Sequence, residues 1–225
     1  MLLLALLLLA GPIAGQERSA AEPAIVTTGE ATVRRAPDEA FVAVAAESRA
    51  KDPREAQRAN AGAMAAVEKR LADLGIPRDA LRTTGLRLEQ EFDVANGRRI
   101  ARDFLARNTL EVRVDEVARA GEVADAAVAA GATAIESIRF DLKERAAAER
   151  EALRLAVVDA RARAEAAAAG AGRTLDRILR IEEGGAARPG PRPMAFARAQ
   201  ADVATPIEAG PIEITSQVTL TVAIK

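Results

Sequence analysis

Apolar and polar residues alternate along residues 212–224 at the end of the chain. Because successive side chains of a strand point to opposite faces, this pattern predicts a β-strand with one apolar and one hydroxyl- and amide-bearing face. Six buried aliphatic side chains would contribute roughly 9–18 kcal/mol before entropy is subtracted. We therefore expect an antiparallel sheet with one side on a core and one side in water. The apolar set, interrupted by Ser216, is Ile212, Ile214, Val218, Leu220, Val222 and Ile224.

Two strands and a helix are predicted near the start of the chain. Alternation marks residues 25–34, and an apolar run at 41–48 is typical of a strand covered on both faces. Since only Ala36-Pro37-Asp38 separates them, we expect these strands to form a hairpin. Asp52 as N-cap, with Pro53 and Glu55 in the first turn, then begins a helix that ends at Gly75 before Pro77. Its expected inward positions are Ala56, Ala59, Ala63, Val67 and Leu71.

A second hairpin is predicted at Asn96-Gly97, a strong two-residue turn signal between alternating segments. A tight turn there would place Val94 opposite Arg99 and Phe92 opposite Ala101, which turns the wrong face of the return strand inward. One residue of slip reverses every face of a strand. We therefore expect either a longer loop or a β-bulge within residues 98–106.

The rest of the chain predicts two more helices and two more strands besides the last one. Asp115 is expected to cap a helix that ends at Gly131, and a strand follows at 135–142. An Ala-rich helix is predicted over about 143–169, then a short strand at 178–181 that ends at Gly184. The expected inward residues of these helices are Val117, Ala120, Ala124, Ala127 and Val128, then Leu153, Val157, Ala160, Ala164 and Ala167. The order ββα-ββα-βα-ββ, with three helices and mixed, largely antiparallel sheets, predicts an α+β fold.

Three further segments are expected outside the regular structure. Residues 1–15 combine an apolar run of about ten residues with a Gly-Pro break and small residues, the pattern of a secretory signal peptide. That run is shorter than the ~20 residues that span a bilayer. Residues 16–23 read as a linker, and 24–225 as the folded domain. Within it, residues 184–210 are rich in Pro, Gly and Ala and predict a mobile arm, or an arm that docks Met194 and Phe196 on a neighbouring subunit.

The composition excludes several kinds of active site. The 225 residues include no His, Cys, Trp or Tyr, so the usual ligands of zinc, haem and iron–sulfur centres are missing. Ser-His-Asp and Cys-His catalysis cannot be assembled either. With 32 basic and 33 acidic residues, the net charge of −1 gives no electrostatic reason to expect a nucleic-acid partner.

Three short motifs suggest chemistry, and each has a simpler interpretation. Ser48 and Lys51 form S-x-x-K, but the serine ends a strand and lacks the helix start and companion motifs of acyl-transfer enzymes. Glu89, Glu91 and Asp93 share one strand face, yet nearby arginines favour a salt-bridged surface. Residues 170–173, Gly-Ala-Gly-Arg, follow a helix and read as its C-cap. We therefore predict no catalytic, cofactor-binding or metal-binding residues, no cofactor and no enzymatic activity.

Several segments of the chain, in their order and spacing, carry a resemblance to known proteins. These segments are Val26–Val33, Ala36–Asp38, Arg107–Val114, Leu175–Gly184 and the residues from Pro206 to the last strand. They resemble the SIMPL domain proteins of bacterial envelopes. Phe104 departs from the expected Tyr and removes a hydroxyl. The resemblance implies a periplasmic or exported protein, and similar proteins include some linked to oxidative-stress defence, some immunogenic antigens and some large rings. It supplies no catalytic residue.

We therefore expect a periplasmic or secreted envelope protein that is not an enzyme and self-associates into a homo-oligomer, tied only indirectly to oxidative-stress defence. The mature chain is expected to lack a stable transmembrane span. The alternative is a periplasmic binding module that holds a small apolar or peptide ligand between its sheet and helices.

Overall fold

The computed structural model describes residues 22–184 and 207–225. The predicted signal peptide, most of the predicted linker and most of the predicted 184–210 arm, with Met194 and Phe196, lie outside these residues. The elements follow the predicted order ββα-ββα-βα-ββ, which confirms the α+β fold. They are β1 (Ala24–Arg35), β2 (Glu39–Ala50), α1 (Pro53–Asp73), β3 (Leu81–Ala95), β4 (Arg98–Val114), α2 (Ala120–Ala129), β5 (Ala134–Asp141), α3 (Arg145–Gly170), β6 (Leu175–Gly184) and β7 (Ile212–Ile224), with 3-10 turns at Arg78–Ala80 and Val117–Arg119.

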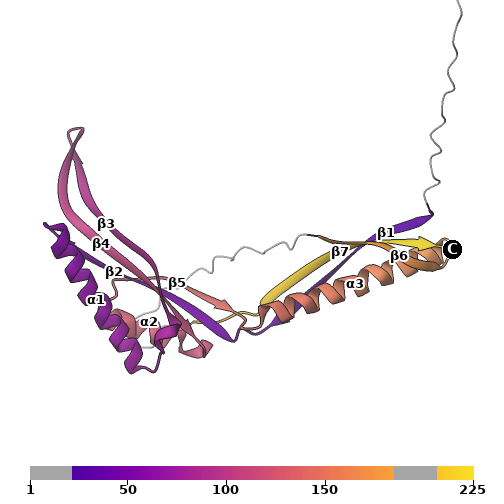
Figure 1. Cartoon of the computed structure of the whole chain (residues 1–225), viewed down its shortest axis with the longest axis horizontal. Coiled ribbons are helices and arrows are strands. Elements are labelled where there is room, and N and C mark those ends of the chain that lie inside the picture. Colours follow the sequence, from indigo (N-terminus) through magenta and orange to yellow (C-terminus); the bar gives the residue numbers. More distant parts are fainter. Residues whose placement is uncertain (1–21, 185–206) are drawn as a thin grey trace, which may run out of the picture.

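The strands form two antiparallel sheets that lie end to end in an elongated molecule (Figure 1). The terminal sheet has the order β1-β7-β6 and packs against α3. The hairpin sheet has the order β3-β4-β2-β5 and packs against α1 and α2. The predicted hairpin of the first two strands is wrong, because β1 pairs with β7 and β2 pairs with β4 and β5. Residues 36–38 instead carry the chain from one sheet to the other.

The terminal sheet is built around β7, as its alternation predicts. Val218, Leu220 and Val222 are buried in a core that α3 closes with an alanine at every fourth position. This alanine stripe lets the helix lie so close to β1 that a Cβ on Gly29 would be 2.2 Å from the backbone nitrogen of Ala160. Of the predicted inward residues of this helix, Ala160 and Ala164 are buried, Leu153 and Val157 lie only at the margin of the core, and Ala167 is exposed. The buried residues of α3 are Ala148, Ala152, Ala156, Ala160, Ala164 and Ala168.

The hairpin sheet has its own core, on the face that α1 and α2 cover. Val42 and Val44 of β2 meet Leu110 and Val112 of β4 there. The other face of β2 is not covered by a second layer of helices or strands. There the guanidinium of Arg139 lies 4.1 Å from the ring centre of Phe41, and Arg107 of β4 pairs with Glu47. The apolar run at 41–48 is therefore a central strand half covered by its neighbours' long polar side chains.

The helix α1 begins and ends as predicted, but one of its inward positions differs. The Asp52 carboxylate accepts hydrogen bonds from the backbone N–H groups of Arg54 and Glu55 at 2.8 and 3.1 Å, and Gly75 adopts a φ of +82° after the C-cap. Ala59 is exposed, whereas Asn60 is buried and its Nδ2 donates to the carbonyls of Ala46 and Ala106 at 2.7 and 3.1 Å. A buried amide thus ties the helix to two strands, a role that the apolar pattern could not show.

The helix α2 starts later than predicted. Asp115 does not cap it, because the turn at Val117–Arg119 intervenes and the residue at the N-cap, Arg119, makes no capping side-chain hydrogen bond. The buried valine is Val123, while Val128 is exposed. Gly131 ends the helix region at a φ of +120°, as expected.

The β3–β4 turn resolves the predicted conflict of register. Asn96 and Gly97 both have positive φ, 50° and 73°, as a type I′ turn requires. Val94 faces Arg99 and Phe92 faces Ala101, after which Gln90 faces Phe104. The strand β4 therefore carries one extra residue between positions 101 and 104, and the predicted β-bulge is confirmed.

Candidate interaction surface

The open face of the hairpin sheet is a ladder of paired charges. Arg107 of β4 donates to both Glu47 and Glu136, and its hydrogen bond to Glu136 is the main reason that the pKa of Arg107 is raised above its ordinary value. Lys51 lies 2.8 Å from a carboxylate oxygen of Asp103 and holds the pKa of that group below its usual range. Arg107 and Asp103 are therefore each paired with an opposite charge on this face.

The three candidate motifs do not assemble into a site. Ser48 lies within β2, and Lys51 is engaged with Asp103, so no serine–lysine pair forms at a helix start. Gly172 has a φ of +66° directly after α3, and the N–H of Arg173 bonds to the carbonyl of Ala168 at 2.8 Å, which is a helix C-cap. In the ranges that the structure describes, no group of three or more acidic side chains is placed to hold a metal ion.

The predicted acidic trio of β3 is divided by its partners. Glu91 accepts a two-pronged hydrogen bond from Arg49 at 3.0 and 3.1 Å, and Asp93 pairs with Arg102 at 3.3 Å. Glu89 has no such partner within residues 22–184 and 207–225. The predicted salt-bridged surface is thus present at two of the three positions.

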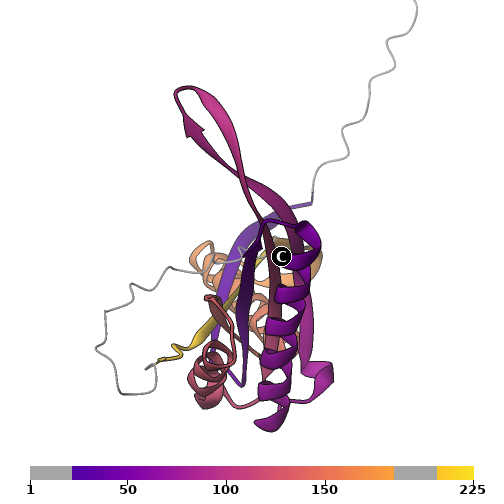
Figure 2. The ribbon, with the colours of Figure 1, turned by 90° about the vertical axis from the view of Figure 1, so that its left-hand side faces the viewer.

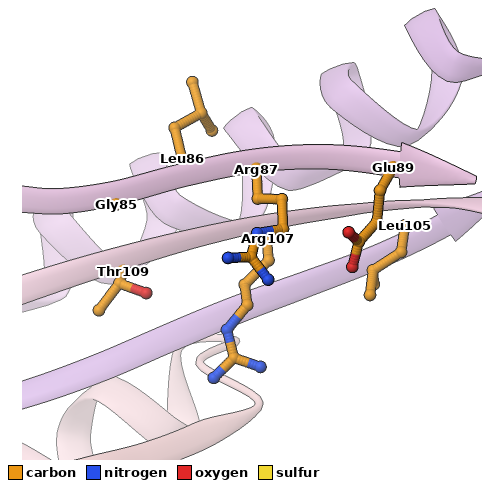
Figure 3. A pocket seen from close by; sticks show the side chains of 7 residues that line it. All are labelled: Gly85, Leu86, Arg87, Glu89, Leu105, Arg107 and Thr109. Atoms are coloured by element: carbon orange, nitrogen blue, oxygen red, sulfur yellow. The ribbon is translucent and has the colours of Figure 1, made fainter.

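Two shallow hollows of about 410 and about 360 Å³ lie on this same open face. Figure 3 shows the larger one, where Arg87, Leu105, Arg107 and Thr109 point to one side of the sheet and Leu86 points to the other. Charged side chains line both hollows, and neither lies between the sheet and the helices. The binding-module alternative calls for an apolar cavity in that position, and these hollows do not supply it.

The most distinctive exposed surface belongs to the β3–β4 hairpin, which extends past the end of α1 (Figures 1 and 2). Every second residue of β3 here points to the α1 side of the sheet. Because α1 lies over β2 and β4 and barely reaches β3, these side chains stay uncovered. Leu86 is 67% exposed and Val94 is 75% exposed. We call Leu86, Leu88, Phe92 and Val94 the β3 stripe.

The terminal sheet has a smaller uncovered patch of the same origin. The helix α3 lies over β1 and β7, so Ile178 and Ile181 of the edge strand β6 remain exposed. The alternation of Leu86–Val94 was visible in the sequence, but we expected it to face a core. Only the strand order, which puts β3 and β6 at the edges, shows that no layer covers these residues.

None of the helices in the described ranges is long and apolar enough to cross a membrane. The sequence model of the SIMPL family, described as proteins of unknown function (DUF541), matches residues 25–222. The 26 kDa periplasmic immunogenic protein of Brucella melitensis is 29% identical over 193 residues, which cover 83% of this chain and 76% of that protein. The protein of the same name in Brucella abortus gives the same figures.

A more distant relative is the uncharacterized protein YggE of Escherichia coli, 27% identical over 138 residues that cover 61% of this chain and 56% of that protein. The periplasmic relatives confirm the predicted location in the cell envelope. Since the family match spans both sheets and all three helices, the protein belongs to the SIMPL family of envelope proteins of unknown function.

Proposed function

We propose that this protein is a non-enzymatic, self-associating protein of the envelope, which acts by presenting a folded surface to its partners. The observation that carries the proposal is the β3 stripe, which leaves four large apolar side chains exposed on a projecting hairpin. Large apolar patches of this kind mark interaction sites on soluble proteins. The edge strands β3 and β6 add unpaired backbone groups beside their apolar residues, which favours association between sheets.

The absence of enzymatic activity is supported by the chemistry of the side chains. The chain has no His or Cys, and the carboxylates of the open face are mostly compensated by arginine or lysine. A link to oxidative-stress defence would therefore be indirect. Met64 is buried against the hairpin-sheet core and would be shielded from oxidants in the folded protein.

Sedimentation of the protein, exported by a bacterial host and purified from the envelope fraction, tests the proposal. We expect an oligomer whose population rises with concentration. Substituting Leu86 and Val94 by Ser should weaken association, whereas Val158→Ser, which changes a 55% exposed valine on α3, should not. A chain that stays monomeric at every accessible concentration would overturn the proposal.

A further inference from the structure

We propose that two copies pair through the outer edges of their β3 strands, antiparallel and about a twofold axis at Leu88. This pairing places Arg87 of each copy opposite Glu89 of the other. It specifies the partner surface of the self-association and so rests on the proposed function. The product is a single sheet that runs through both copies, with the hairpin sheets joined edge to edge.

The outer edge of β3 is free to accept another strand. β3 is the first strand in the order β3-β4-β2-β5, so its outward backbone N–H and C=O groups have no neighbour among the described strands. It is 15 residues long and contains no proline, and its register with β4 is regular from Gly85 to Gln90, the stretch around Leu88. A second β3 would satisfy these groups, and isologous pairing of this kind closes a dimer without open-ended growth.

The charges of β3 indicate which partner fits. Five charged residues of β3 lie on its open face, and three of them have a partner within the chain. Arg82 pairs with Glu111, Glu91 with Arg49 and Asp93 with Arg102. Arg87 and Glu89 have no ion pair or hydrogen-bond partner within the described residues. The residue directly across from Arg87 is Arg107, whose own partners are Glu47 and Glu136. A carboxylate from outside would supply the partner that Arg87 lacks.

The register follows from the same charges. In a twofold antiparallel pair, residues equally far from the axis face each other on the same side of the sheet. An axis at Arg87 or at Glu89 would oppose that residue to itself, and an axis at Gln90 would oppose Glu89 to Glu91. An axis at Leu88 gives two Arg87–Glu89 pairs instead. It also brings the two Leu88 side chains together on the other face, beside Leu86 and Gln90.

Charge reversal tests this register, with sedimentation velocity as the readout. Each single variant, Arg87→Glu or Glu89→Arg, turns two attractive pairs into two repulsive ones, and we expect association to weaken about tenfold. The double variant R87E/E89R should recover it. An equimolar mixture of the two single variants should recover it as well, since position 87 of one then attracts position 89 of the other. Arg150→Glu on α3 is the matched control and should leave association unchanged.

A disulfide gives independent proof of the axis. Because the chain has no cysteine, Leu88→Cys introduces one thiol per copy, and copies paired at that residue hold the two thiols within reach of a disulfide. We expect rapid formation of a covalent dimer under mild oxidation, and much slower cross-linking for Val158→Cys, an exposed position on α3. If the unmodified protein associates but neither the reversals nor Leu88→Cys behave as stated, the β3 pairing is wrong and self-association stands. If the unmodified protein does not associate at all, both fall.

Discussion

Replacing Gly29 by alanine should break the close contact between α3 and β1. Gly29 lies on β1 where α3 crosses it, and an added Cβ would be 2.2 Å from the nitrogen of Ala160, 2.3 Å from the oxygen of Ala156 and 2.7 Å from the Cα of Ala160. All three are backbone atoms, so no rotamer change can make room. The whole helix would have to move away from the strand.

The expected cost follows from what that movement breaks. Overpacking a close-packed contact costs about 1–3 kcal/mol. Two hydrogen bonds cross the same contact, from the Thr27 hydroxyl to the carbonyl of Ala160 at 2.9 Å and from the Glu30 N–H to Asp159 at 3.0 Å. Because each is worth about 1 kcal/mol, we expect a loss at the upper end, about 3 kcal/mol, and a fall in Tm of about 6–12 °C.

Far-UV circular dichroism is the appropriate assay, since the chain has no Trp or Tyr and gives little intrinsic fluorescence signal. Gly62→Ala is the matched control of opposite sign. Gly62 lies inside α1, a Cβ there meets nothing within 4 Å, and alanine is the better helix former by about 0.5–1 kcal/mol. If Gly29→Ala melts like the unmodified protein while Gly62→Ala is stabilised, the close approach of α3 to β1 is not as described and the reasoning is refuted.

Three further substitutions have definite expected outcomes. Asn60→Ala should lower stability in urea melts by about 1–3 kcal/mol because it removes the donor of two buried hydrogen bonds to strand carbonyls, whereas Ala59→Ser on the exposed side should have little effect. Burial, with Asp141 and Asp38 nearby, raises the pKa of Glu39 above 4.5, so its ionised form opposes folding above that raised pKa. Glu39→Gln should therefore raise Tm at pH 7 and lose this advantage below about pH 4.5; an advantage that persists in acid would contradict the assignment. The hydrogen bond from the Glu30 N–H lowers the pKa of Asp159, which then stabilises the fold above its ordinary pKa and ceases to do so as the pH falls through the lowered value. Asp159→Asn should lower Tm at neutral pH by an amount that shrinks in strong acid, and an unchanged difference across the titration would count against it.

The elements could be predicted from the sequence because each is fixed by local chemistry. The alternation of β7 marks a strand with one buried face, and Asp52 with Pro53 marks the start of α1 without reference to the rest of the chain. The bulge of β4 could also be predicted, because a tight Asn96-Gly97 turn and the apolar face of the return strand could not both be satisfied without an extra residue.

Strand pairing could not be predicted in the same way. The segments 25–34 and 41–48 adjoin in the sequence and suggested a hairpin, yet β1 finds its partner 177 or more residues further along the chain, from Arg35↔Ile212 to Ala24↔Ala223. Both β2 and β7 offer an apolar face to β1, and the sequence pattern alone does not choose between them. The contact of α3 with β1 favours the pairing of β1 with β7. The alanines of α3 fit against Gly29 of β1, and β2 has no glycine at which a helix could approach as closely.

Because the sequence does not give the strand order, it also does not show that the β3 stripe is exposed, although it correctly predicts a strand there. The apolar positions of β3 alternate as they would over a core, and alternation does not say whether a layer lies above them. The charged residues on the opposite face of β3 do indicate that the strand lies at an edge. On a strand with charged neighbours on both sides, Arg87 and Glu89 would be expected to find partners as Glu91 and Asp93 do, but β3 has a neighbour on one side only. An arginine and a glutamate without partners, two positions apart on an edge strand, are self-complementary about the residue between them. This symmetry is already present in the sequence. It becomes an argument for pairing between two copies only because the fold places β3 at the edge of its sheet.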